Sequence, residues 1–168
     1  MLIDAVKLVL FPAMMAFAAS SDLLTMTISN RVSLVLVAGF FALALLAGLP
    51  AAQIGMHVAA AMVVLAVAFV FFAFGWIGGG DAKLAAATAL WLGFEQLLPY
   101  ALYASLLGGV LTFLIIRFRV WPLPDFLARQ DWAQRLHRQD AGVPYGIALA
   151  IAALLIYPET VLMKPVGM

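Results

Sequence analysis

The sequence predicts an all-α, polytopic membrane protein with about six transmembrane helices, forming a single domain over residues 1–168. Composition indicates this class, since 67% of the 168 residues are hydrophobic and only 10% are charged. Ordinary soluble domains are about 45–50% apolar and about 25% charged. The apolar residues also form continuous runs without alternation, which argues against a transmembrane β-barrel. The net charge of +1 is too small to indicate a nucleic-acid partner, so the expected surroundings are a lipid bilayer.

The membrane segments follow from the length that a helix needs to cross the bilayer core, roughly 20 apolar residues for about 30 Å. Division at polar residues, glycines and prolines gives six segments: residues 2–19, 32–49, 54–76, 82–94, 97–116 and 144–162. We expect the first segment to remain in the mature protein. It is long for a signal peptide, and it begins with Asp4 and Lys7 where a signal peptide has a basic region.

The fourth segment departs from the pattern because its 13 residues span only about 20 Å as a helix. It follows residues 75–80, four of which are glycine. Non-helical backbone at membrane depth is tolerated only where it is buried in protein or faces water. We therefore expect a break before the fourth helix and a cavity beside Asp81.

The connection between the fifth and sixth segments, residues 117–143, is the longest polar stretch. Within it Ala128, Trp132 and Leu136 recur every four residues, which predicts an amphipathic helix on the cytoplasmic surface. Its arginines would lie near anionic head groups. A mobile loop is the alternative interpretation.

Orientation follows from the basic residues. The connections after the first, third and fifth segments hold seven of the nine: Arg31, Lys83, Arg117, Arg119, Arg129, Arg135 and Arg138. Only Lys7 and Lys164 fall on the other side. The positive-inside rule then places these connections in the cytoplasm and both termini outside. Asp22 and Asp81 become two of five carboxylates on the cytoplasmic side, each at a helix boundary.

Asp22 and Asp81 are the candidate catalytic residues. Singly, Asp81 is explained as a helix cap and Asp22 as a solvated loop residue. As a close pair they could not both ionise. The ionised carboxylate could then take a proton from water while the protonated one polarises a peptide carbonyl, which is the chemistry of an aspartic protease. We do not assign the general base, because such a pair titrates as a unit.

These residues resemble a known family. Residues 78–81 match the GxGD signature of intramembrane aspartic proteases, and with Lys83 and Leu84 they resemble the GxGDxKL form of type IV prepilin peptidases. Asp22, followed by the Ile-Ser-Asn of residues 28–30, resembles that family's first catalytic aspartate and its I-P-N element, with serine in place of proline. Residues 144–146 resemble the element that opens the family's last membrane helix.

The resemblance implies an aspartic endopeptidase of the bacterial inner membrane. Its substrates would be type IV prepilins or pseudopilins, cut on the cytoplasmic side after a glycine and before the apolar helix, with pilus assembly components as further partners. The chain is similar in size to the short peptidases of tight-adherence (Flp-type) pilus systems. Because it has no cysteine, it lacks the zinc region of larger members, and their N-methyltransferase activity is not expected. No cofactor or metal is expected either, since His57 and His137 are isolated.

Four further residues are candidates for shaping the site. Gly78 and Gly80 would form the substrate path. Lys83 either holds a substrate carboxylate, or tunes the pair, or extends to the membrane interface. Asn30 either caps the second helix or binds substrate.

Two other functional classes remain open at this point. One is a small transporter that uses Asp81 at a broken helix. The other is a non-catalytic membrane scaffold of a secretion system.

Overall fold

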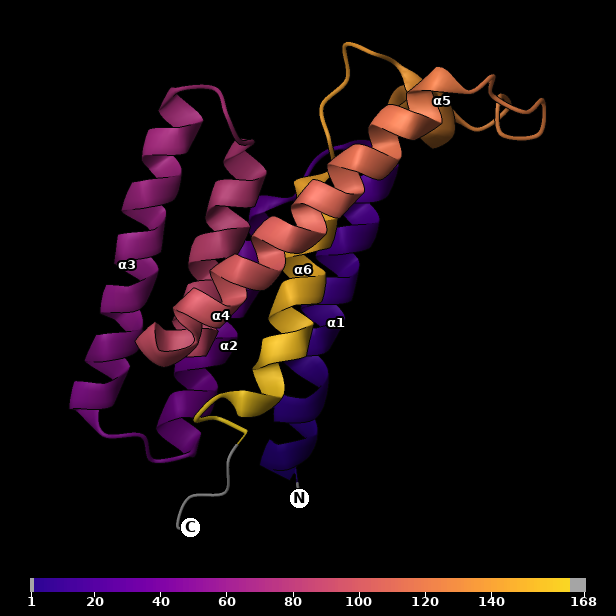
Figure 1. Ribbon diagram of the computed structural model, residues 1–168. Helices are drawn as coiled ribbons and strands as arrows, with labels where there is room; N and C mark the ends of the chain where they lie inside the picture. The colour runs from indigo at the N-terminus through magenta and orange to yellow at the C-terminus, as the bar shows by residue number, and fades with distance from the viewer. Residues whose placement is uncertain (1, 164–168) are drawn as a thin grey trace.

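The computed structural model describes residues 2–163 and consists of helices joined by short connections (Figure 1). In chain order these are α1 (Leu2–Thr25), α2 (Asn30–Leu46), α3 (Ala51–Ala73), α4 (Gly79–Val120), α5 (Asp131–His137), α6 (Tyr145–Ile156) and the short 3-10 helix η1 (Tyr157–Glu159). In this part of the chain, α1, α3 and α4 are long and apolar enough to cross a membrane, while α2 and the stretch Tyr145–Glu159 are shorter apolar helices. The predicted all-α class is confirmed, and a multi-pass membrane protein is supported.

Helix α4 contains a break at Gly93 that divides it into two helices. Gly93 has φ +67° and ψ 175°, a conformation open essentially to glycine alone. A carbonyl just before such a break lacks its usual partner in the next turn. The His57 ring makes a hydrogen bond with the Leu90 carbonyl instead, with Nδ1 at 2.8 Å from the oxygen. The predicted fourth and fifth segments are therefore the two halves of α4, joined with almost no loop. Figure 1 shows the second half leaving the break at an angle and rising towards α5.

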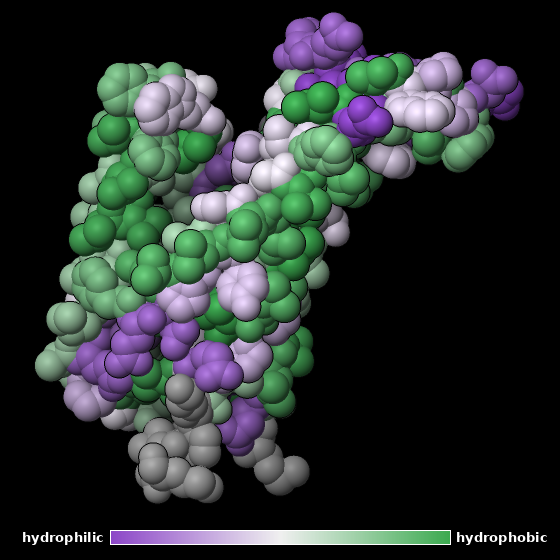
Figure 2. Space-filling model, in the orientation of Figure 1, coloured by the Kyte–Doolittle hydropathy of each residue, from purple (hydrophilic) through white to green (hydrophobic). Residues whose placement is uncertain are grey.

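The core lies where α1, α2, α6 and the first half of α4 meet. Trp91 is fully buried there, and its indole N–H donates to the Leu36 carbonyl at 2.9 Å. The Phe11 ring packs against Trp91 and Tyr157, with centroid distances of 5.0 and 4.4 Å. The visible outer face is mostly apolar, with polar residues gathered towards its two ends (Figure 2). Such a surface suits helices surrounded by lipid.

The start of α4, the start of α6 and the C-terminal end of α1 lie together at the end of the molecule opposite the N-terminus (Figure 1). We call this the aspartate end, because it carries Asp22 and Asp81. The side of the membrane that it faces stays a prediction from the basic residues. One of those residues, Lys164, lies outside the described part of the chain.

The structure corrects several predicted boundaries. Helix α1 runs to Thr25, so Asp22 lies inside its last turns and not in a loop. No helix breaker interrupts residues 20–25, and the Thr25 hydroxyl bonds the Ser21 carbonyl at 2.7 Å. The helix ends only at Met26, which has φ +55°.

The amphipathic helix in the long polar connection is also shorter than its spacing predicted. It covers only the seven residues of α5, and Ala133 is its fully buried residue. The sixth predicted segment begins at Pro144, whereas α6 begins at Tyr145 with Pro144 as its N-cap.

Candidate active site

Asp22 is held by the first turn of α6. Its side chain is buried, with 5% of the residue exposed, and the Gly146 N–H donates to Oδ2 at 2.7 Å. The first N–H groups of a helix lack partners within it and favour an anion there. A Cβ on Gly146 would lie 2.8 Å from this carboxylate oxygen and 2.7 Å from Ile28 Cδ1. The close approach of α6 to Asp22 therefore needs glycine at position 146.

Asp81 lies in the first turn of α4, whose N-cap is Gly78. A backbone hydrogen bond from Gly78 reaches its carboxylate, as in a capping box. The other carboxyl oxygen, Oδ1, is buried and has no hydrogen-bond partner among residues 2–163. The cap interpretation thus accounts for one oxygen of Asp81 and leaves the second available for another partner.

Both aspartates line one cavity of about 360 Å³ at the aspartate end. The remaining lining residues come from the connection between α1 and α2, the start of α2 and the start of α4: Met26, Thr27, Ile28, Asn30, Gly78, Gly79, Gly80 and Lys83. All six residues that the sequence singled out for the site are among these cavity-lining residues. We call this space the polar cavity.

Gly80 lets the start of α4 lie against the connection between α1 and α2. A Cβ at this position would approach Ile28 Cβ to 3.1 Å and the Ile28 backbone nitrogen to 3.3 Å. Gly80 therefore serves a close contact with the Ile28 backbone beside the polar cavity.

Lys83 and Asn30 join α4 to α2 across the polar cavity. Lys83 Nζ donates to Asn30 Oδ1 at 2.9 Å. The predicted capping role of Asn30 is wrong, because the cap of α2 is Ser29, whose hydroxyl accepts from the Arg31 N–H at 3.3 Å. Serine is a good N-cap residue, and its presence frees the Asn30 side chain for the lysine.

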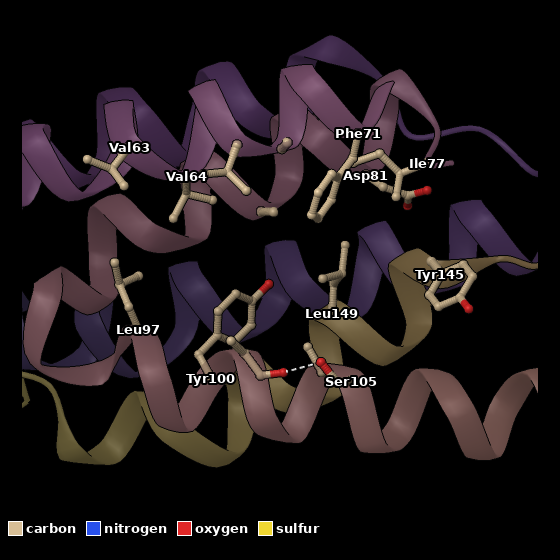
Figure 3. A pocket seen from close by; sticks show the side chains of 15 residues that line it. Val63, Val64, Phe71, Ile77, Asp81, Leu97, Tyr100, Ser105, Tyr145 and Leu149 are labelled. Carbon is tan, nitrogen blue, oxygen red and sulfur yellow. Dashed lines mark hydrogen bonds between the residues drawn. The ribbon is translucent and has the colours of Figure 1, made fainter. Parts of the chain in front are cut away.

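Asp81 also lines a second, apolar space of about 400 Å³. Figure 3 shows its walls, formed by α3 on one side and by the second half of α4 and α6 on the other, with Asp81, Ile77 and Tyr145 at one end. We call this space the apolar groove. Asp81 therefore belongs to the lining of both the polar cavity and the apolar groove.

The chemistry available at the site is that of two carboxyl groups. The described residues contain no group of three or more His, Cys, Asp or Glu side chains placed to hold a metal ion. The sequence did not reveal the Gly146 hydrogen bond to Asp22, because positions 22 and 146 are distant along the chain. Its only signal in the sequence was the resemblance of residues 144–146 to the element that opens the family's last membrane helix.

A site of two carboxyls at the end of a membrane helix bundle is typical of a membrane-embedded aspartic peptidase. Residues 9–113, more than half of the chain, match the family model described as the type IV leader peptidase family. The chain therefore belongs to this family and is an aspartic prepilin leader peptidase. The matched residues include Asp22 and Asp81. Comparisons with curated proteins and with solved structures gave no match.

Proposed function

We propose that this protein removes the basic leader of Flp-type prepilins or pseudopilins at the cytoplasmic face of the bacterial inner membrane, with Asp22 and Asp81 as the catalytic pair. The observation that carries the proposal is that the two aspartates, 59 positions apart in sequence (81 − 22), line one polar cavity. Membership of a peptidase family favours hydrolysis over the transport and scaffold alternatives. The absence of cysteine from these 168 residues supports the Flp-type substrate.

The proposed reaction uses one ionised and one protonated carboxyl group. The ionised carboxylate takes a proton from a water molecule, and the oxygen of that water bonds to the scissile carbonyl carbon. The protonated partner gives its proton to the carbonyl oxygen, which forms a neutral tetrahedral diol. Collapse of the diol breaks the C–N bond. A proton passes to the leaving amine, and the second product is the carboxyl group of the leader.

The surroundings of the two aspartates support this chemistry. The Gly146 N–H fixes one Asp22 oxygen, which restricts the rotation of that carboxyl group. The Asp81 Oδ1 atom is buried and lacks a protein partner among the described residues, and we assign the water molecule or the substrate carbonyl as its partner in the reaction. Gly78 and Gly80 narrow the substrate path, and the Lys83–Asn30 bond closes the side formed by α2.

The test is cleavage of a co-expressed Flp-type prepilin by Asp22→Asn and Asp81→Asn. Each substitution keeps the side-chain shape, and removal of an acid–base group costs about 10²- to 10⁴-fold in rate. Asp140→Asn is the matched control, because Asp140 is an exposed carboxylate paired with Arg138. Both dyad variants should insert and fold without processing the prepilin, while the control cleaves normally. Normal cleavage by both dyad variants would end the proposal.

A further inference from the structure

The apolar groove is large enough to hold part of a ligand. Its volume of about 400 Å³ lies within the roughly 300–1,000 Å³ typical of ligand sites. Its lining is almost wholly apolar, and its polar side chains are Asp81, Tyr100, Ser105 and Tyr145. The groove would therefore accept a short apolar segment and not a charged one.

The break at Gly93 makes room for this groove. The second half of α4 crosses away from α3 after the break (Figure 1), and small side chains line the space between them. These are Ala68, Ala85, Ala101 and Ala104. The groove lies between the hydrophobic helices α3 and α4, so its occupant would enter sideways from the bilayer.

Two buried polar atoms indicate what kind of molecule the groove receives. Asp81 Oδ1 and the Tyr100 hydroxyl both lack a hydrogen-bond partner among the described residues, and Tyr100 is only 4% exposed. The Thr88 hydroxyl lies close to the Tyr100 hydroxyl but does not meet hydrogen-bond geometry with it, and it donates to Met15 Sδ at 3.9 Å. Ser105, by contrast, is satisfied by the Ala101 carbonyl at 2.7 Å (Figure 3).

A lipid acyl chain would leave both of these atoms without a partner. A buried polar group without a hydrogen bond costs about 1–3 kcal/mol, and an acyl chain has no donor or acceptor. A peptide carries an N–H and a C=O on nearly every residue, including unpaired N–H groups in the first turn of a helix. The lining therefore favours an apolar peptide over a lipid tail.

We propose that the apolar groove binds the start of the hydrophobic segment that follows the scissile bond, and that the Tyr100 hydroxyl bonds the backbone of that segment. This inference rests on the proposed function. The leader would lie in the polar cavity and the mature segment in the apolar groove, because Asp81 lines both. The scissile peptide then falls beside Asp81, where the two spaces meet.

The helix geometry of α4 gives the distance along the substrate between the scissile bond and the contact with Tyr100. Thr88, the neighbour of Tyr100, is seven residues after Asp81 on the same helix, which corresponds to about 10 Å. Tyr100 would therefore meet the substrate about three residues beyond the cut if that stretch is extended. If the stretch is helical, the contact falls about seven residues beyond the cut.

The direct test places a photoreactive benzophenone amino acid at Ala101, an exposed residue of the groove lining, in the full-length protein. The matched control is the same amino acid at Ala66, which is exposed on α3 outside the groove lining. The probe is a Flp-type prepilin with a basic leader, a glycine before the cut and an apolar helix after it. We expect cross-links from position 101 to the first residues after the cut, and none from position 66.

Cleavage is measured on the same preparations, so that failure of the groove assignment can be distinguished from failure of the proposed function. Absence of cross-links from position 101, or equal cross-linking from positions 66 and 101, with cleavage retained by the unlabelled protein would overturn the groove assignment alone. Failure of the unlabelled protein to cleave the prepilin would overturn the proposed function, and the groove assignment with it.

Kinetics of Tyr100→Phe provide an independent readout. Loss of one hydrogen bond of about 0.5–1.5 kcal/mol should raise KM roughly 2- to 10-fold and leave kcat nearly unchanged. Tyr103→Phe is the control, since Tyr103 is 45% exposed on the same helix and does not line the groove. An unchanged KM in Tyr100→Phe, or an equal rise in the control, would contradict the contact.

Discussion

Replacement of Gly146 by alanine would place a methyl group where the Asp22 carboxylate now lies. The added carbon would stand 2.8 Å from Asp22 Oδ2, 3.1 Å from Asp22 Cβ and 2.7 Å from Ile28 Cδ1. Optimal separations between non-bonded heavy atoms are about 3.5–4.0 Å, so α6 and Asp22 must separate by about 1 Å. That shift would break the 2.7 Å bond from the Gly146 N–H.

The expected fall in kcat/KM follows from the lost hydrogen bond between the Gly146 N–H and Asp22. A hydrogen bond to a charged group contributes about 1.5–3 kcal/mol. If that contribution serves to orient the catalytic carboxylate, kcat/KM for prepilin cleavage should fall about 10- to 150-fold. The assay is cleavage kinetics of a purified prepilin by the protein in proteoliposomes, with thermal unfolding measured on the same samples.

Gly109→Ala is the matched control for Gly146→Ala. Gly109 also lies in a membrane helix, and a Cβ there meets no heavy atom within 4 Å. Its kcat/KM should stay within about twofold of the parent, since alanine is the better helix former. A folded Gly146→Ala variant with the parent's kcat/KM would refute the role given to the α6 N-terminus.

Three further predictions concern the break at Gly93, the Lys83–Asn30 hydrogen bond, and the pair of Asp22 and Asp81. Gly93→Ala forces a side chain into a glycine-only conformation 3.0 Å from the His57 ring; it should lower the free energy of unfolding by about 1–3 kcal/mol, seen as a lower Tm than that of Gly109→Ala. Lys83→Met removes the bond to Asn30; because this bond is exposed to solvent, its contribution should lie near the low end, about 1.5 kcal/mol, of the range for a charged donor, so kcat/KM should fall no more than about tenfold, and a loss as large as that of the aspartate variants would contradict this supporting role. Because the reaction needs one ionised and one protonated carboxyl, kcat/KM should fall at both low and high pH; a rate that is flat from pH 4 to 9 would contradict the dyad.

The apolar helices could be predicted because hydrophobic run length is a local property of the chain. The six predicted runs correspond to α1, α2, α3, the two halves of α4, and α6 with η1. The end of α1 could not be placed in this way. Polar residues such as Ser21 and Asp22 suggested a loop, whereas the backbone of residues 20–25 stays helical and buries Asp22 against α6.

Contacts between elements that are distant along the chain could not be predicted from the sequence. In the sequence His57 is an isolated histidine. In the structure its ring makes a hydrogen bond with the Leu90 carbonyl, beside the break at Gly93. A cap was one of the two roles expected for Asn30, because its type suits that position, yet the neighbouring Ser29 is the cap. The candidate site was predicted at the level of residue types, while the hydrogen bonds that orient those residues depend on packing.

The most direct test of the central claim is a double-variant cycle on Asp22 and Asp81. Cleavage of the prepilin by purified Asp22→Asn, Asp81→Asn and the double variant is compared with the parent. Residues that act as one catalytic unit show strongly non-additive losses. We predict that each single variant loses about as much kcat as the double variant. Losses that multiply, or a single variant that retains the parent's rate, would contradict a shared catalytic pair.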